Sequence, residues 1–110
     1  MATFVISQSS DGQFRFTLKA TNGETILNSE TYTAKANCLG GVESVRDNSQ
    51  LDERYEKKNA ADGKPYFVLL AANRQPIGTS ETYDSTSNRD AGIASVKKNA
   101  PDADTDDQTA

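Results

Sequence analysis

The sequence predicts an α+β fold made by tandem duplication of a β-β-β-α unit. The first observation is a repeat: sliding the chain on itself by 51 residues makes 16 of 38 aligned positions between 11–48 and 62–99 identical, far more than chance gives. The tetrapeptide Ser-Glu-Thr-Tyr stands at 29–32 and again at 80–83. The second observation is a change of period, because apolar residues alternate before the first tetrapeptide and follow a helical spacing after it. Strands followed by a helix are therefore expected in each copy.

The two copies are expected to share one core. Each half has only about 50 residues, a size at which an isolated unit buries too little surface to be stable. We therefore predict a single domain over residues 1–100, made of two repeats at about 1–49 and 50–100. Residues 101–110 contain four Asp, no Lys or Arg and few apolar side chains. Such a composition predicts a disordered acidic tail.

The first copy opens as a three-stranded meander. Residues 3–7 form a β-branched and aromatic run that predicts a short strand. In 14–19 the side chains alternate, with Phe14, Phe16 and Leu18 on one face and Arg15, Thr17 and Lys19 on the other. Asn22-Gly23 is a tight-turn signal and leads into a third strand over 25–28.

A helix is expected after the first tetrapeptide. Cys38, Val42 and Val45 stand at i, i+4 and i+7, which is one stripe of an amphipathic helix. Gly41 recurs as Gly92, although Gly within a helix costs roughly 1 kcal/mol relative to Ala. We therefore expect the helix to approach the sheet closely at this position.

The second copy repeats this order with different surfaces. Residues 54–58 align with the first strand but are highly charged, which suits an edge or partly exposed strand. Residues 66–70 repeat the second strand with apolar side chains on both faces, and Pro76 stands at the entry to the third. The second helix is expected over about 86–98, with Ile93 and Val96 facing inward.

The composition argues for a non-enzymatic binding or interaction module in the cytoplasm. The chain has no histidine, so the usual general base and the commonest metal ligand are absent, and no cofactor, metal-ligand or phosphate-loop spacing occurs. The single Cys38 falls on the apolar stripe, suits a reducing compartment and is assigned to the core. No stretch approaches the roughly 20 apolar residues of a membrane span. An unknown protein partner or weak self-association is expected.

Two alternative functions remain open. A carboxylate-based enzyme could use Glu30 and Glu81, the acidic members of the two tetrapeptides, if the fold brings them together. A single-stranded nucleic-acid binder could stack bases on Phe14 and Phe16 of the sheet. The net charge of −4 argues against the second, because without the tail acidic and basic residues balance and no basic run is present.

The repeat resembles the YegP-like family of small bacterial proteins. The resemblance covers about residues 3–100 and rests on Asp-Gly-Gln-Phe-Arg-Phe-Thr-Leu-Lys-Ala at 11–20, Asn-Gly-Glu at 22–24, the two tetrapeptides and Gly-Ile-Ala-Ser-Val at 92–96. It implies one antiparallel sheet with both helices packed on its concave face, and a strand after each helix exchanged with the other unit. It implies no catalytic residues.

An apolar patch is the one candidate interaction site. If both helices cover one sheet face, Tyr66, Val68 and Leu70 project from the other, where the first copy has Arg15, Thr17 and Lys19. A contiguous exposed apolar patch commonly marks a contact surface. We therefore predict that Tyr66, Val68 and Leu70 form a weak dimer interface or a partner interface, unless strand curvature or the exchanged strand covers them.

Overall fold

Both copies of the repeat fold into the same order of elements in the computed structural model, which describes residues 2–109. In the first copy, β1 (Thr3–Gln8), β2 (Phe14–Lys19) and β3 (Thr25–Asn28) precede helix α1 (Lys35–Asn48). In the second, β4 (Tyr55–Asn59), β5 (Pro65–Leu70) and β6 (Pro76–Thr79) precede helix α2 (Thr86–Asn99). Short 3₁₀ turns follow the helices, η1 (Asp52–Arg54) and η2 (Ala100–Asp102), and β7 (Asp104–Asp107) comes after η2.

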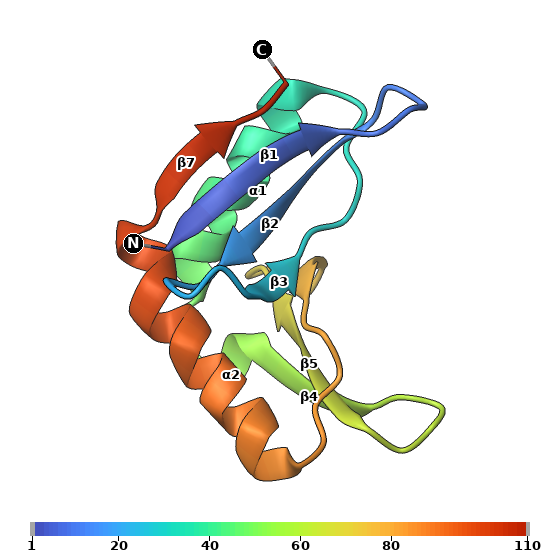
Figure 1. Cartoon of the computed structure of the whole chain (residues 1–110), viewed down its shortest axis with the longest axis vertical. Coiled ribbons are helices and arrows are strands. Elements are labelled where there is room, and N and C mark those ends of the chain that lie inside the picture. Colours follow the sequence, from blue (N-terminus) through green and yellow to red (C-terminus); the bar gives the residue numbers. More distant parts are fainter. Residues whose placement is uncertain (1, 110) are drawn as a thin grey trace.

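All seven strands belong to one sheet, in the order β4-β5-β6-β3-β2-β1-β7 (Figure 1). The two repeats join where β3 pairs with β6, through Asn28 and Thr79. Each helix crosses the junction, because α1 contacts β2 of its own repeat and β5 and β6 of the other, while α2 contacts β5 and β3. The predicted α+β architecture and its internal duplication are confirmed. Six strands are antiparallel neighbours, and β7 makes the sheet mixed because it runs parallel to β1.

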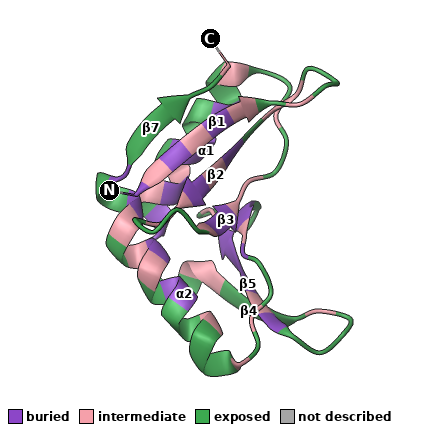
Figure 2. Cartoon of the chain, in the orientation of Figure 1, coloured by how far each residue is buried: buried purple, intermediate pink, exposed green. Residues whose placement is uncertain are grey.

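The prediction of a disordered tail over 101–110 is wrong for the described part of that segment. Residues 104–107 form β7, which pairs with Thr3–Ile6 of β1 and lies beside it in Figure 1. The composition misled because β7 is held by its main chain and by contacts from α1, neither of which needs apolar side chains. All four residues of β7 are exposed, as Figure 2 shows.

The core lies between the helices and one face of the sheet. Phe4, Phe16, Leu18, Phe67 and Leu69 are completely buried on this face. The helices contribute the predicted stripe and its counterpart in the second copy, namely Cys38, Val42, Val45, Ile93 and Val96. Burial raises the pKa of the Cys38 thiol, with a smaller contribution from Asp107, so this group stays protonated at neutral pH.

The repeated tetrapeptide is a structural device. Ser29 Oγ accepts a hydrogen bond from the Phe16 amide at 2.8 Å, and Ser80 Oγ accepts the equivalent bond from Phe67 at 2.9 Å. The Tyr32 ring stacks against Phe16 and fills the space that a Cβ on Gly41 would need. Tyr83, Phe67 and Gly92 repeat this arrangement in the second copy. The expected close approach at the shared glycine is confirmed, and the group that approaches it is the tyrosine.

Candidate functional site

The outer edge of β4 is an open edge of the sheet. On its inner side β4 pairs with β5 from Tyr55 to Asn59. On its outer side no strand of residues 2–109 pairs with it, since β4 ends the strand order. At the other end of the sheet, β7 covers the outer edge of β1. The prediction that the charged segment at 54–58 forms an edge strand is confirmed.

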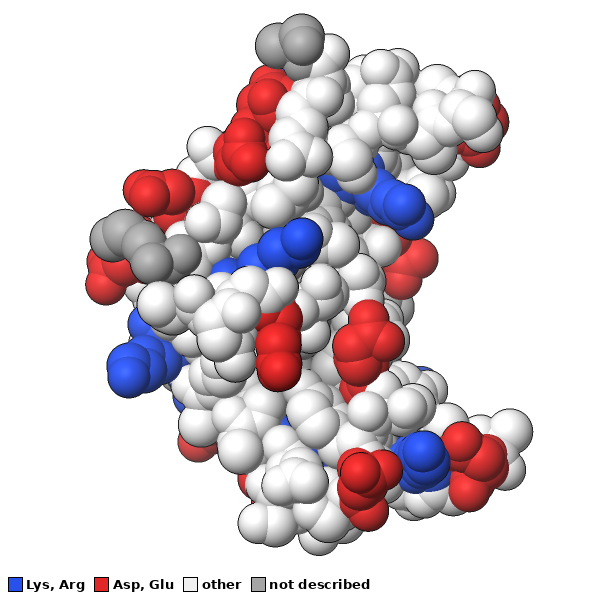
Figure 3. All heavy atoms as spheres, viewed as in Figure 1, with Lys and Arg blue, Asp and Glu red and all other residues white. Residues whose placement is uncertain are grey.

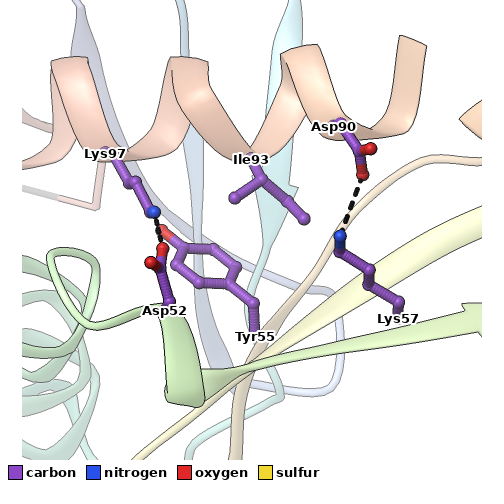
Figure 4. A pocket seen from close by; sticks show the side chains of 6 residues that line it. All are labelled: Asp52, Tyr55, Lys57, Asp90, Ile93 and Lys97. Carbon is purple, nitrogen blue, oxygen red and sulfur yellow. Dashed lines mark hydrogen bonds and ion pairs between the residues drawn. The ribbon is translucent and has the colours of Figure 1, made fainter. Parts of the chain in front are cut away.

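A cleft of about 490 Å³ lies between this edge and helix α2, and we call it the β4–α2 cleft. Its lining consists of side chains from η1, β4 and α2: Asp52, Tyr55, Lys57, Asp90, Ile93 and Lys97. Tyr55 and Ile93 form its floor, and an ion pair stands at each end (Figure 4). The volume falls within the range of roughly 300–1,000 Å³ that is typical of ligand pockets.

Lysines and aspartates pair across the cleft. Lys57 Nζ lies 3.3 Å from Asp90 Oδ1, and Lys97 Nζ pairs with Asp52 Oδ1. Burial alone would raise the pKa of Asp90, but hydrogen bonds from Arg89 and Lys57 outweigh it and lower that pKa. The carboxylates are largely open to solvent, with side-chain exposures of 52% for Asp90 and 87% for Asp52. Exposed ion pairs of this kind are worth little, so they exchange partners easily.

Tyr55 anchors the floor of the β4–α2 cleft. Its hydroxyl donates a hydrogen bond to the Ser49 carbonyl at 2.8 Å, and Lys97 Nζ lies 5.7 Å from the centre of its ring. Burial raises the pKa of the Tyr55 hydroxyl far above its usual range. The phenol is therefore a fixed donor at neutral pH and not a proton-transfer group.

The β4–α2 cleft is the counterpart of the groove in which β7 lies. An offset of 51 residues maps Phe4 onto Tyr55, Val42 onto Ile93, and Arg46 onto Lys97. The geometry follows this mapping, because the Arg46 guanidinium lies 4.9 Å from the centre of the Phe4 ring, as Lys97 lies over Tyr55. The same sheet edge and helix surface are thus built twice. The groove between β1 and α1 carries the strand β7, and we call it the β7 seat.

Arg46 holds the strand in the β7 seat. Its Nη1 donates to the carbonyls of Ala103 at 2.8 Å, Ala100 at 3.1 Å and Pro101 at 3.3 Å. Its Nη2 donates to Thr105 Oγ1 at 3.2 Å. Further along, Lys35 pairs with Asp107 and lowers the pKa of that carboxyl to about 2.

The main chain of β4 presents free pairing groups toward the outside. In the β7 seat, the carbonyls of Ala2 and Ile6 point outward and accept from the amides of Asp104 and Gln108. The position equivalent to Ile6 is Lys57. Because the carbonyl and the amide of one strand residue point to the same side, the repeat directs both main-chain groups of Lys57 outward. The Tyr55 amide is already bonded to the Asp52 carbonyl.

The predicted patch of Tyr66, Val68 and Leu70 is not an exposed surface. Tyr66 is half-buried, while Val68 and Leu70 are only 7% and 4% exposed. β5 lies inside the sheet, with Glu56 and Thr79 opposite Val68 on the same face. Cross-strand neighbours on one face pack against each other, so a central strand is shielded even where no helix covers it. The sequence analysis allowed for cover by strand curvature or by the exchanged strand, whereas the neighbours of Val68 on this face come from the flanking strands β4 and β6.

The two tetrapeptide glutamates do not meet in one pocket. Glu81 lines a cleft of about 580 Å³ together with Glu24, Tyr83 and Asn88, among other residues, and Glu30 is not among the described residues that line it. The Glu81 side chain accepts a hydrogen bond from Asn28 Nδ2 at 2.9 Å. Both glutamates are exposed. The paired-carboxylate hypothesis therefore gains no support from the geometry.

The aromatic residues of β2 are not a stacking surface for bases. Phe16 is completely buried and Phe14 packs against the core, so both face the helices. Acidic side chains gather over β7 (Figure 3). Within residues 2–109, no group of three or more His, Cys, Asp or Glu is placed to hold a metal ion, and no helix is long and apolar enough to cross a membrane.

Sequence reasoning did not find the β4–α2 cleft, although a signal was present. The offset of 51 residues that revealed the duplication also pairs Arg46 with Lys97 and Phe4 with Tyr55. What could not be read from the sequence is that residues 104–107 fill one of the two grooves.

Comparison with known proteins gives a consistent result. The profile of the family described as "Domain of unknown function (DUF1508)" matches residues 9–56 and 60–107. The UPF0339 proteins YegP of Shigella flexneri and of Escherichia coli K12 are 57% and 56% identical over 106 residues, or 96% of each chain. The solution structure of a UPF0339 protein from Shewanella oneidensis superposes with a TM-score of 0.91 at 50% identity, covering 96% of this chain and 90% of the other. That of Escherichia coli yegP, a protein of unknown function, gives 0.92 at 54%, covering 97% and 92%.

Proposed function

We propose that this chain, which belongs to the DUF1508 family, is a non-enzymatic binding module that captures an extended polypeptide segment on the free edge of β4. The supporting observation is the pair of equivalent grooves, of which one already holds a strand in the same chain. Adding a strand to an exposed sheet edge is a common mode of peptide recognition, with affinity from main-chain bonds and specificity from side-chain pockets. The β4–α2 cleft offers both.

The charges on β4 favour selective binding of a segment over indiscriminate pairing with other strands. Glu56, Lys57 and Lys58 stand in its centre, and charged side chains on an edge strand oppose indiscriminate pairing. The floor of Tyr55 and Ile93 supplies apolar contact beneath the polar rim. A module that binds a segment of another protein needs no histidine, metal or nucleophile. We place this activity in the cytoplasm, where a single buried thiol such as Cys38 stays reduced.

Selection from a library of displayed random peptides tests this proposal on the full chain. We expect enriched peptides to slow the hydrogen exchange of the Lys57 amide, because an outward amide becomes hydrogen-bonded when a strand is added. Lys57→Pro removes that amide and should reduce binding by roughly two- to tenfold, the range for one hydrogen bond, since proline is tolerated on an edge strand but cannot donate.

Lys57→Ala is the matched control, because it shortens the same side chain and keeps the amide. It should retain most of the main-chain pairing, and both variants should match the parent in thermal unfolding. Enriched peptides that bind Lys57→Pro as tightly as the parent would show that the β4 edge is not the site.

A further inference from the structure

Resting on the proposed function, we infer that the β4–α2 cleft accepts an acidic segment of a partner protein, which runs parallel to β4 and presents oxygen acceptors at two alternate positions. The acceptor at the first position would face Lys97 and that at the second would face Lys57. The occupied β7 seat supplies the template for the direction, the register and the chemistry.

The direction and register come from β7. It runs parallel to β1, with Thr105 opposite Phe4 and Asp107 opposite Ile6. These two side chains face α1, because Thr105 accepts from Arg46 and Asp107 pairs with Lys35. A strand in the β4–α2 cleft would therefore direct side chains at i and i+2 toward α2, the first opposite Tyr55 and the second opposite Lys57.

Both cations of the β7 seat have counterparts in the β4–α2 cleft. At the first position Arg46 is replaced by Lys97, which lies over the equivalent ring. At the second, the helix residue Lys35 is replaced by Thr86, and the apolar Ile6 is replaced by Lys57. The positive charge has moved from the helix to the strand, but it still faces the same point of the groove. The two positions that receive Thr105 and Asp107 in one groove therefore have a lysine each in the other.

The aspartates of the cleft serve as internal substitutes for the absent acceptors. Asp90 holds Lys57, and its counterpart in the β7 seat is the uncharged Leu39. Asp52 holds Lys97, and the residue at the matching position of the first copy is Met1, whose side chain is uncharged. Acidic side chains thus stand at these positions only in the groove without a strand. An incoming acidic strand would exchange one exposed ion pair for another at each lysine, and it would add main-chain pairing.

A peptide copied from this chain is the natural probe. The sequence of residues 100–109, Ala-Pro-Asp-Ala-Asp-Thr-Asp-Asp-Gln-Thr, is amide-capped and titrated into the ¹⁵N-labelled full chain. We expect shift changes at the Lys57, Asp90 and Lys97 amides. Binding should weaken with added salt, because exposed charge pairs are screened. The same peptide with Asn at every Asp should bind more weakly.

Two double variants isolate the role of the lysines. Lys57→Gln with Lys97→Gln should weaken peptide binding by roughly two- to fivefold per lysine, the range for exposed ion pairs. Lys58→Gln with Lys98→Gln removes the same charge from neighbouring residues that do not line the cleft, and it should leave the affinity within twofold.

The outcomes separate this inference from the proposed function. Equal binding of the Asp and Asn peptides at the β4–α2 cleft would overturn acidic recognition while leaving strand addition intact. Shift changes confined to Phe4, Arg46 and β7 would show exchange at the β7 seat instead and would overturn the inference. The absence of any shift change at millimolar peptide would also overturn the inference. The library selection would still test whether the β4 edge binds an extended peptide.

Discussion

Leu27 and Gly78 occupy the same position of the repeat and meet each other at the junction of the two copies. A Cβ placed on Gly78 would lie 2.6 Å from both Cγ and Cδ2 of Leu27, which is completely buried. The two residues are 51 positions apart and stand on β3 and β6, the strands that join the repeats. Where a duplicated position meets itself, only one copy has room for a side chain, and here the first copy supplies it.

Gly78→Ala should therefore destabilise the fold by about 1–3 kcal/mol, the usual cost of adding a methyl group to a filled core. Leu27→Ala should cost about 2–5 kcal/mol by leaving a cavity. The double variant should be more stable than the sum of the two effects predicts, because the smaller side chain makes room for the new Cβ. Chemical denaturation of all four proteins measures this coupling, and strict additivity would show that the two residues do not compete for space.

Gly40 and Gly41 are neighbours in α1 that should respond oppositely to alanine. A Cβ on Gly41 would collide with the Tyr32 ring, whereas a Cβ on Gly40 meets nothing within 4 Å. Gly40→Ala should stabilise the chain by about 0.5–1 kcal/mol through helix propensity. Gly41→Ala should destabilise it by about 1–3 kcal/mol, because the tyrosine must move. Thermal unfolding of the two variants is the measurement, and a stabilising Gly41→Ala would contradict the packing described for Tyr32.

Arg46→Ala should loosen β7 and lower the free energy of unfolding by about 1.5–3 kcal/mol, the range for hydrogen bonds to a charged donor. For a chain of about 100 residues, each kcal/mol lowers Tm by roughly 4–8 °C. The matched control is Lys97→Ala, which should cost less than about 1 kcal/mol because its ion pair is exposed and it holds no added strand within residues 2–109. Equal losses in calorimetry would show that Arg46 does not hold β7.

The attachment of β7 should depend on acid through Asp107. Its pKa in the folded chain is about 2, below the unfolded value of about 3.9, because Lys35 and Thr109 stabilise the carboxylate. The group therefore stabilises the fold above about pH 4, and this contribution is lost as the pH falls toward 2. The difference in unfolding free energy between the parent and Asp107→Asn should shrink over that window.

The control for acid dependence is Asp106→Asn. The Asp106 carboxylate accepts a hydrogen bond from Gln108 Nε2 and pairs with no lysine among the described residues. Asp106→Asn removes a carboxylate from the same strand and leaves the pair of Lys35 with Asp107 in place, so it serves as the reference for Asp107→Asn. A difference for Asp107→Asn that stays constant from pH 7 to pH 2 would contradict the role assigned to the pair with Lys35.

Most of the fold could be predicted because local patterns and the duplication agree. The alternation in 14–19 and the stripe of Cys38, Val42 and Val45 gave elements whose buried faces the structure confirms. The third strand of the first copy, Thr25–Asn28, has the predicted bounds. The duplication gave further support to each element, although the alternation itself is lost over 66–70 of the second copy.

The errors occurred where main-chain pairing or sheet neighbours decide the outcome. β7 carries three aspartates in four residues and shows no apolar period, so its pairing with β1 and its contacts with Arg46 left no trace in the pattern. The exposure of Val68 and Leu70 depends on which strands flank β5, and the position of a strand within a sheet is a tertiary property. The candidate site combines both difficulties. It lies at the β4 edge, where no strand of residues 2–109 takes the place that β7 takes beside β1.

The parallel pairing of β1 with β7 has a mechanical consequence. β1 lies near the beginning of the chain and β7 near its end, and the two strands run side by side in the same direction. A pull applied through the residues before Thr3 and after Asp107 would drag the strands past each other lengthwise. All their ladder bonds would then bear load together and could not open one at a time. The segment whose composition predicts disorder would therefore set the resistance of the chain to stretching.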